Sequence, residues 1–390
     1  MLLQQSDTVV ESLERLILSG WYGEAEKLND QGLMQGALNA DAHRQIQNAI
    51  DALRQNGAQQ DFPGHEVFGF SEGMIVSSLQ FRPLTEYRHM QAAFKQGVNW
   101  IEIETSSQCN RKCHYCPNSQ IDRRSDNSFM DAQVFTRLVN NLRDIDYEGT
   151  IALVGLNEFF MHEENFQYLA HIRKSLPKCS IRLFSNGDYV TSEHLDRAAQ
   201  CGVSEMFITL HGSADAAYNA EYVLDRIVRF QKKTGVQFTL EAYEKDERLN
   251  FYADIHGMRL TIGSLNFDQI GHNWAGELDF KASKTRQAPC SYPLRQFVVN
   301  YAGDIFICCV VPRDKKAHTK DLGTMVGNLA DYPSLFDAYG SEAMRQWREA
   351  SFSTRNLPKP CDTCTGHEGV DETRFVELAD YVGAHNRAIS

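Results

Sequence analysis

Three cysteines lie close together in the stretch SSQCNRKCHYCPN, residues 106–118. Cys109, Cys113 and Cys116 have the spacing C-x3-C-x2-C. Thiolates are soft ligands, which favour iron–sulfur clusters or zinc over magnesium or calcium. A structural zinc site commonly pairs two C-x2-C units, and the sequence has no second unit nearby. Three thiols on one short polar stretch therefore indicate a metal site that lacks a fourth protein ligand.

A second group of cysteines lies in the last third of the chain. Cys290 and Cys308 flank FVVNYAGDIFIC, which predicts two β-strands about a Gly-Asp turn. Cys361 and Cys364 follow as a C-x2-C pair. Four thiolates complete a site, and zinc or an iron–sulfur cluster would satisfy that count. We expect Cys309 to be a spare thiol on the other face of the strand from Cys308.

The composition suits a globular protein of several domains. The 390 residues are 42% hydrophobic and 23% charged, with a net charge of −12. An acidic chain without a dense Lys/Arg block is a poor partner for nucleic acid. No apolar run is long enough for a membrane span, and the first residues do not resemble a signal peptide. We therefore expect a cytoplasmic protein with reduced cysteines, of which Cys179 and Cys201 are buried apolar side chains.

Elements that would position the first cysteine group alternate along residues 98–265. Strand-like runs alternate with helical ones: NWIEIET, GTIALVG, SIRLFSNG, EMFITLHG, VQFTLEAY and MRLTIG. This alternation builds parallel βαβ units, and six repeats suffice for a partial (β/α)6 barrel. Ligands of such sheets bind on the loops after the strands. The cysteine run directly follows the first strand, at such a position.

The remaining segments frame this α/β core. We predict helices over residues 1–57, starting with SDTVVESLERLILSG, and an irregular connecting segment over 58–97. The partial barrel spans 98–275. A small C-terminal α+β domain spans 286–370, and a tail follows over 371–390.

The cysteine motif in this setting resembles that of the radical S-adenosylmethionine enzymes. In that family three thiolates hold a [4Fe–4S] cluster, and S-adenosylmethionine chelates the fourth iron. The resemblance implies reductive cleavage of S-adenosylmethionine to a 5′-deoxyadenosyl radical, which abstracts hydrogen from a C–H bond. It also implies an electron donor such as flavodoxin or ferredoxin.

Two further stretches resemble cofactor-binding segments of the same family. VGLNEFFMH corresponds to a Gly-Gly-Glu-Pro segment, with Asn157 and Phe159 in place of the second Gly and the Pro. FSNGDYV corresponds to an Asn-Gly turn. The cofactor contacts that the resemblance implies are Tyr115, Gly155, Asn157, Glu158, Ser185 and Asn186.

The C-terminal cysteines resemble those of the SPASM/twitch extension of these enzymes, which binds auxiliary [4Fe–4S] clusters. A full SPASM domain uses seven cysteines for two clusters. We therefore expect one auxiliary cluster on Cys290, Cys308, Cys361 and Cys364, and structural zinc is the alternative. An auxiliary cluster is proposed in relatives to accept an electron from a substrate radical or to shape the pocket.

Candidates for acid–base chemistry come from the barrel strands. We name Glu241 and His211 as catalytic candidates, while Glu102, Glu104 and Tyr243 lie on strands that could also face the interior. For each, a structural role paired to Arg or backbone is the alternative. The loop residues His272, Asn273 and Trp274 could line a polar substrate or form a plain linker.

The function that we predict is hydrogen abstraction from a small polar substrate such as a sugar or aminocyclitol. Dehydrogenation, cross-linking and epimerisation all stay open as the net reaction. The first alternative is a peptide or protein maturase, whose N-terminal helices would dock a leader. RNA modification is disfavoured by the acidic charge. A non-catalytic iron–sulfur or zinc-binding protein is the alternative of another class.

Overall fold

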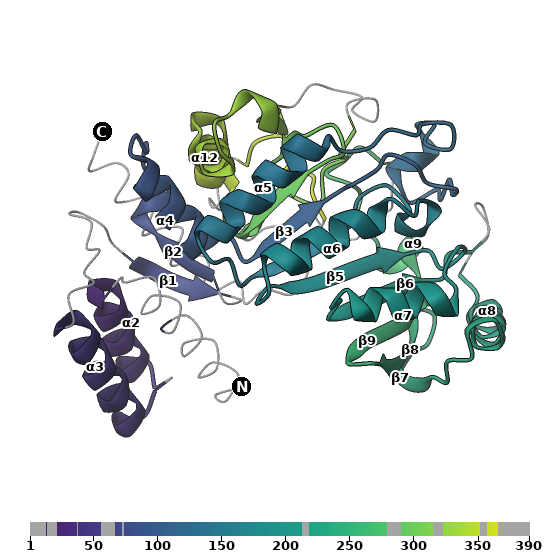
Figure 1. Cartoon of the computed structure of the whole chain (residues 1–390), viewed down its shortest axis with the longest axis horizontal. Helices are drawn as coiled ribbons and strands as arrows, with labels where there is room; N and C mark the ends of the chain where they lie inside the picture. Colours follow the sequence, from purple (N-terminus) through teal and green to yellow (C-terminus); the bar gives the residue numbers. More distant parts are fainter. Residues whose placement is uncertain are drawn as a thin grey trace.

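A mixed α/β sheet forms the centre of the molecule (Figure 1). The computed structural model describes residues 13, 22–36, 38–55, 67–71, 74–212, 218–278, 290–314, 323–351 and 357–365. None of the helices in these ranges is long and apolar enough to cross a membrane. The α/β class and the partial-barrel architecture predicted from the sequence are confirmed.

Four parallel strands make up the middle of the sheet: β3 (Trp100–Ile103), β4 (Thr150–Leu153), β5 (Ser180–Ser185) and β6 (Glu205–Thr209). Helices follow β3, β4, β5 and β6 in turn: α5 (Ala132–Asp144), α6 (Asn165–Ser175), α7 (Ser192–Gln200) and α8 (Ala220–Thr234). Figure 1 shows α5, α6 and α7 on the same face of the sheet. Side chains along β5 alternate between buried and half-buried, because one face packs on the helices and the other lines the barrel interior.

Local sequence explains where these helices begin and end. Asp131 caps α5 by accepting hydrogen bonds from the N–H groups of Gln133 and Val134. Asn219 caps α8 in the same way, through the N–H of Tyr222. The helix then ends at Gly235, whose φ of +76° is in the left-handed region that glycine tolerates. Such caps make the helix positions recognisable from sequence.

The fifth predicted repeat differs from expectation. VQFTLEAY contains β7 (Thr239–Glu244), which turns back into β8 (Arg248–Ile255) and then β9 (Met258–Leu265). These strands pair antiparallel, and β9 rather than β7 lies beside β6. Two tight turns with positive φ, at Asp246 and at His256–Gly257, allow the reversals. The prediction of a βα repeat here was therefore wrong, and β7 is an edge strand.

The C-terminal segment extends the same sheet. Its strands are β10 (Gln296–Val299), β11 (Asp304–Phe306) and β12 (Met325–Asn328). The predicted β10–β11 hairpin is confirmed. However, β10 also pairs in parallel with β3, so the strand order is β12-β11-β10-β3-β4-β5-β6-β9-β8-β7. The strand that precedes the first cysteine group and the hairpin between Cys290 and Cys308 thus belong to one continuous sheet.

The segment before the barrel is more ordered than predicted. Residues 58–97 contain β1 (Val67–Ser71), β2 (Met74–Ser77), the 3-10 turn η1 (Ser78–Gln80) and helix α4 (Tyr87–Gly97). The expectation of an irregular connection was wrong, because Ala93 and Phe94 of α4 are buried in the core. Phe94 packs edge-to-face on Phe297 of β10, and on Phe336 and Tyr339 near the C-terminus, with ring centroids 5.3–5.7 Å apart.

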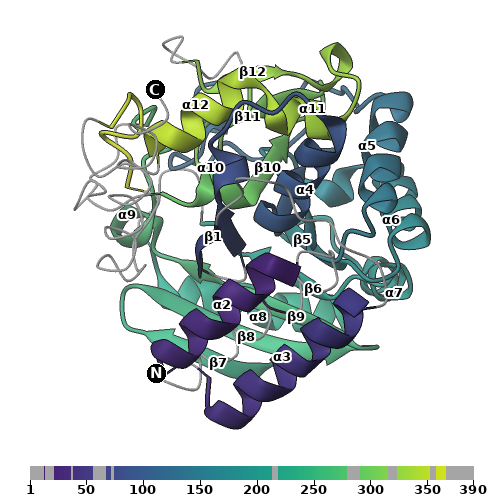
Figure 2. The same cartoon turned by 90° about the vertical axis from the view of Figure 1, so that its left-hand side faces the viewer.

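Of the remaining described helices, Figure 2 shows α2 and α3 at one end of the molecule and α11 and α12 at the other. These remaining helices are α2 (Tyr22–Met34), α3 (Ala40–Gln55), α9 (Phe267–Ile270), α10 (Tyr292–Arg295), α11 (Leu335–Gly340) and α12 (Glu342–Ser351). The helical character predicted for 1–57 is seen in α2 and α3. The first predicted helix lies outside the described residues except for Leu13, which is helical and buried, and so does the tail over 371–390.

Candidate active site

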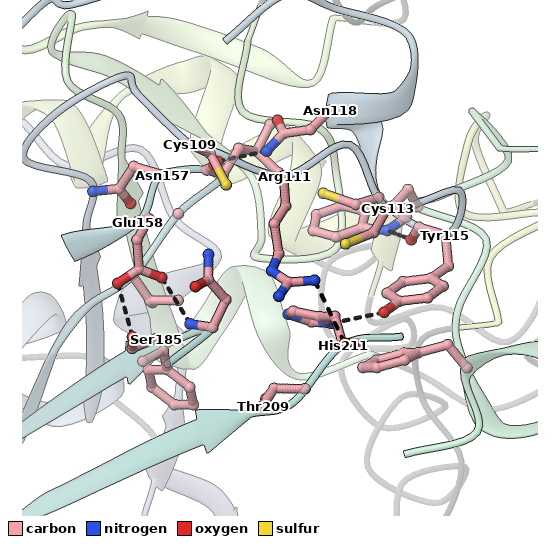
Figure 3. Close-up of a pocket in the computed structure, with 18 residues that line it drawn as sticks. Cys109, Arg111, Cys113, Tyr115, Asn118, Asn157, Glu158, Ser185, Thr209 and His211 are labelled. Carbon is pink, nitrogen blue, oxygen red and sulfur yellow. Dashed lines mark hydrogen bonds between the residues drawn. The ribbon is translucent and has the colours of Figure 1, made fainter. Parts of the chain in front are cut away.

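The first cysteine group lies on the loop after β3, at the carboxyl end of the strand, as predicted. The backbone N–H of Cys116 donates to the carbonyl of Cys113 at 3.0 Å, and that of Cys109 donates to the carbonyl of Arg123 at 3.1 Å. Cys116 precedes the short 3-10 turn η2 (Pro117–Ser119). These bonds fold the loop so that all three cysteines line one pocket (Figure 3).

The chemistry of the three thiols fits a cluster site. Burial is the main cause that raises the pKa of Cys109 to about 11 and that of Cys116 to about 12, and the neighbouring thiols raise both further. A site of converging thiols that resist ionisation becomes stable as thiolates only when it binds cationic metal. No three His, Cys, Asp or Glu side chains within the described ranges converge on one point as a single metal ion requires. A cluster relaxes that requirement, because each thiolate binds a different iron.

Glu158 lies in the pocket and is fully hydrogen-bonded to protein. Its carboxylate accepts from the hydroxyl of Ser185 at 2.7 Å, the N–H of Asn186 at 2.7 Å and the N–H of Phe160 at 3.1 Å. Burial is the main cause that raises the pKa of Glu158, whereas these hydrogen bonds lower it. The structure therefore brings three of the predicted cofactor contacts together, with Glu158 holding the turn after β5 in place.

The need for glycine at position 155 comes from a contact within the protein. A Cβ at this position would lie 2.5 Å from Cγ of Glu104, so only glycine fits. The Glu104 carboxylate, fully buried, accepts from the N–H of Leu156 at 2.6 Å and from Nη1 of Arg123 at 2.6 Å. Asn157, beside them, donates through Nδ2 to the hydroxyl of Ser106 at 3.1 Å. This segment is thus shaped by a buried carboxylate beneath the pocket.

A charged cluster that the sequence did not predict joins the cysteine loop to the turn after β5. Arg111 forms two hydrogen bonds with Asp188, from Nη2 at 2.6 Å and from Nε at 2.7 Å. Arg226 of α8 pairs with the same carboxylate at 2.9 Å. Asn110 bridges Asp188 and Asn186, at 2.7 and 2.8 Å. The two guanidinium groups hold the pKa of Asp188 below its usual range, against its burial.

His211, a predicted catalytic candidate, lies in the pocket beside Tyr115 (Figure 3). Its Nδ1 is 2.7 Å from the Tyr115 hydroxyl. The Tyr115 ring stacks on Phe267 with centroids 4.2 Å apart, and its carbonyl accepts from Nε1 of Trp274 at 2.9 Å. Burial, with Arg111 and Arg226 nearby, lowers the pKa of His211 to about 3. The imidazole is therefore neutral near pH 7, where it can form hydrogen bonds but is a weak base.

Glu241, the other catalytic candidate, does not line this pocket. It lies on edge strand β7, where it pairs with Arg259 at 2.8 Å, and Tyr243 on the same strand is exposed. The prediction for Glu241 depended on a βα repeat that the antiparallel turn back into β8 replaces. Glu102 and Glu104 have the structural role that was the alternative to a catalytic one, because they pair with the buried Arg313 and Arg123.

The side chains of the loop after β9 contact two different parts of the protein, the pocket and the C-x2-C segment. Trp274 lines the pocket, as expected of a residue over its mouth. Asn273 instead donates from Nδ2 to the carbonyl of Thr363 at 2.8 Å and from its backbone N–H to the hydroxyl of Thr365 at 3.1 Å. Burial lowers the pKa of His272 to about 4. This loop therefore ties the pocket to the C-x2-C pair.

The C-terminal cysteines come together although they are far apart in sequence. Burial raises the pKa of Cys308 well above its usual value, and the thiols of Cys309, Cys290, Cys364 and Cys361 raise it further. Such a group of thiols fits a four-thiolate cluster by the same argument as the first group. Cys309 lies past the end of β11 rather than on it, and its backbone N–H donates to Oε1 of Gln296 at 3.2 Å.

Buried ion pairs connect β3 and the cysteine loop to the segment that follows Cys308 and Cys309. Arg123 bridges Glu104 and Asp314, at 2.6 and 3.1 Å, and all three side chains are at most 5% exposed. Arg313 pairs with Glu102 and donates to the carbonyls of Val154 at 2.8 Å and Cys309 at 3.4 Å. Sequence alone could not find these pairs, because the partners are 19 to 211 residues apart.

Comparison with known proteins identifies two families in this chain. Residues 103–258 match the model of the Radical SAM superfamily, and residues 290–365 match the SPASM model, an iron-sulfur cluster-binding domain. An S-adenosyl-L-methionine-dependent 2-deoxy-scyllo-inosamine dehydrogenase of Niallia circulans is 28% identical over 122 residues. That match covers 31% of this chain and 48% of the relative, or about half of its length.

Two solved structures resemble the chain at low sequence identity. BtrN in complex with AdoMet and 2-DOIA is 20% identical, with a TM-score of 0.47 over 70% of this chain and 94% of that one. Native anSMEcpe with bound AdoMet is 13% identical, with a TM-score of 0.41 over 74% of this chain and 98% of that one.

The family predicted from the cysteine spacing is thus confirmed, and with it the cofactors that the family implies. A radical SAM domain uses S-adenosylmethionine and a [4Fe–4S] cluster, and a SPASM domain binds auxiliary iron–sulfur clusters. The chain belongs to the radical S-adenosylmethionine superfamily through residues 103–258 and carries a SPASM iron–sulfur cluster-binding domain in residues 290–365.

Proposed function

We propose that this protein is an enzyme that oxidises a small polar substrate, of the sugar or aminocyclitol class, by radical hydrogen abstraction. The observation that carries the proposal is the pocket in which Cys109, Cys113 and Cys116 meet Glu158 and the Ser185–Asn186 turn. The dehydrogenase of Niallia circulans acts, by its name, on an inosamine, which supports this substrate class.

The residues of the pocket divide into two roles. Cys109, Cys113 and Cys116 would hold the cluster that supplies the electron for cleaving S-adenosylmethionine. Glu158 and Asn186 present polar atoms to the pocket, where they would orient the polar end of the cosubstrate. Tyr115 and its stacked partner Phe267 form an aromatic wall that excludes water from the same space.

The barrel interior supports a polar, ring-shaped substrate. Phe184 lines the pocket and stacks on Phe207 with centroids 5.1 Å apart. Two residues earlier on the same strand face, Arg182 pairs with Glu205 at 2.8 Å and lies 5.1 Å from the ring centroid of Trp100. Both charged side chains are 30% exposed, but neither lines the pocket. Phe184, which does line it, offers an aromatic surface to the apolar face of a ring that carries hydroxyl and amino groups.

The net reaction that we propose is oxidation of a secondary alcohol to a ketone. The bound cosubstrate would supply a 5′-deoxyadenosyl radical that accepts the hydrogen atom from the carbinol carbon. The hydroxyl proton would then leave to solvent, and an auxiliary cluster held by the C-terminal cysteines would accept the remaining electron. Cys290, Cys308, Cys361 and Cys364 are the proposed ligands of that cluster.

Anaerobic reconstitution tests the proposal. We expect about eight iron atoms per chain and release of 5′-deoxyadenosine with a strong reductant. A Cys109/Cys113/Cys116→Ala variant should keep about half of the iron and release none. With deuterium on the carbinol carbon of 2-deoxy-scyllo-inosamine, the label should appear in 5′-deoxyadenosine. Binding of zinc in place of iron would overturn the enzyme assignment.

A peptide maturase remains the second candidate, because α2 and α3 form a hairpin outside the sheet whose face could dock a leader (Figure 1). Leader-dependent release of 5′-deoxyadenosine, without release on any cyclitol or sugar, would favour it. For either substrate we propose a cytoplasmic location, where the ten cysteines stay reduced, and a protein electron donor such as flavodoxin or ferredoxin.

A further inference from the structure

Helix α8 has an exposed face that is apolar and basic. Tyr222, Leu224 and Val228 are 43%, 42% and 46% exposed, which is unusual for large apolar side chains on one helix. The second half of the helix adds the exposed side chains of Arg229, Lys232 and Lys233. A merely solvated helix face would be polar throughout. We call this face, from Tyr222 to Lys233, the α8 face.

The charge of the α8 face is opposite to that of the chain. Around it lie five cations, Arg111, Arg226, Arg229, Lys232 and Lys233, and three carboxylates, Asp188, Glu221 and Asp225. The local excess is thus two positive charges (five minus three), whereas the whole chain has a net charge of −12. A basic patch on an acidic protein attracts an acidic partner to one place on its surface.

Hydrogen bonds join the α8 face to the cysteine loop. Lys233 donates through Nζ to the carbonyl of Asp188 at 3.1 Å, and Arg226 pairs with the Asp188 carboxylate at 2.9 Å. The same carboxylate holds Arg111 at 2.6 Å. Arg111 lies between Cys109 and Cys113 in sequence and lines the pocket with them. A partner on the α8 face would therefore be two residues away from the loop that holds the cluster.

Figure 1 shows α8 at the end of the molecule toward which β5 points, the end that carries the cysteine loop. Its features are exposed apolar side chains next to a group of exposed basic ones. Weak electron-transfer encounters have such interfaces, with small buried areas and association rates that depend on salt. An electron donor also needs to approach the cluster without entering the substrate pocket, and the α8 face lies outside that pocket.

We infer that the α8 face is the docking surface for an acidic one-electron carrier protein of low potential, which reduces the cluster on Cys109, Cys113 and Cys116. The acidic surface of the carrier pairs with Arg229, Lys232 and Lys233, while Leu224 and Val228 bury against its apolar rim around the redox group. One electron passes to the cluster, and the carrier leaves one electron more oxidised. This inference rests on the proposed function.

The test compares two reductants on the reconstituted protein. Arg229→Glu/Lys232→Glu reverses the charge of the face from an excess of two positive to two negative charges, and it leaves in place the pocket residues and Lys233, which is bonded to Asp188. Arg143→Glu/Lys174→Glu, on α5 and α6, is the matched control at another exposed site. Stopped-flow spectroscopy follows cluster reduction by reduced flavodoxin, by reduced ferredoxin and by dithionite, at low and high salt.

We expect the double variant to slow reduction by at least one carrier protein about tenfold or more at low salt, and added salt to erase the difference. Reduction by dithionite and dithionite-driven release of 5′-deoxyadenosine should stay unchanged, and the control variant should match wild type. Equal carrier rates in wild type and the double variant would overturn the inference, as would a wild type that neither carrier reduces. If dithionite itself drives no cleavage with substrate present, the proposed function fails instead.

Discussion

Glu158 is the residue on which the polar wall of the pocket depends. Its two oxygens accept three hydrogen bonds, two of them from backbone N–H groups. In Glu158→Gln the new NH2 group faces a donor at one of these positions, so we expect a loss of about 1–3 kcal/mol in the free energy of unfolding. Urea unfolding of the metal-free protein measures this. Binding of S-adenosylmethionine to the reconstituted variant should weaken in parallel.

Ser185→Ala is the matched control, since it removes one donor and leaves the carboxylate with both backbone partners. We expect it to destabilise the protein less than Glu158→Gln. Equal stability of all three proteins would show that the carboxylate does not hold the turn.

His211 should make stability depend on pH in the acid range. Its pKa is lowered from an ordinary 6.5 to about 3, so the folded state favours the neutral imidazole. The resulting stability is complete above pH 6.5 and is lost as pH falls toward 3, where the folded state must take up the proton. His211→Asn should therefore lose less stability than wild type between pH 7 and pH 4.5, measured as urea midpoints.

His272→Asn supplies a comparison, because burial lowers the pKa of His272 to about 4 at a site tied to the C-x2-C loop. A slope that is the same in His211→Asn and wild type would contradict the buried neutral histidine.

At the scale of single residues, the sequence predicts the cluster ligands better than the residues that hold the cysteine loop in place. Cys109, Cys113 and Cys116 are recognisable because their spacing is local. Arg111 and Asp188 are not, since they are 77 residues apart and neither belongs to a pattern. Only the arrangement of the strands brings their loops together.

At the scale of elements, Gly155 shows how the segment after β4 is fitted to its neighbour. An alanine Cβ would lie 2.5 Å from Glu104 Cγ and would push this carboxylate away from Arg123. We expect Gly155→Ala to destabilise the protein by about 1–3 kcal/mol, the usual range for overpacking. Chemical unfolding gives the value.

A double-mutant cycle with Glu104→Ala isolates that contact. The clash disappears when the carboxylate is absent, so the two substitutions should be less harmful together than the sum of their separate effects. Strict additivity would mean that Gly155 is required for another reason.

Elements whose ends are marked in the sequence by capping residues or glycines were predicted correctly, and elements without such signals were not. α8 has a capping Asn219 and a terminal Gly235. α4 was missed because its burial depends on Phe297, Phe336 and Tyr339, which lie far away in sequence. β8 was missed because LNFYADI lies between turns that single residues, Asp246 and His256, make by adopting positive φ.

At the scale of the whole molecule, the two cysteine groups should bind metal separately and stabilise one fold. Cys361→Ala/Cys364→Ala removes half of the second group, and we expect the variant to keep about half of the iron, together with cleavage of S-adenosylmethionine by dithionite. Turnover of substrate to ketone should be lost, because the second electron has no acceptor. Iron analysis and product assays separate these outcomes.

Removing the iron should lower the stability of the whole chain. Ligands that bind only the folded state stabilise it by mass action, and the buried thiols are otherwise unionised. We expect the melting temperature of the reconstituted protein to exceed that of the metal-free protein. An unchanged melting temperature would show that the cysteine groups contribute nothing to the folded state.

The pairing of β10 with β3 has a consequence for synthesis. The first barrel strand leaves the ribosome early, but its outer neighbour begins only at Gln296, after the other central strands have been made. Until then β3 is an open edge with free peptide groups, which other nascent chains can pair with. A chain stalled or cleaved before residue 296 should therefore aggregate or require a chaperone, even though it holds every residue of the first cysteine site.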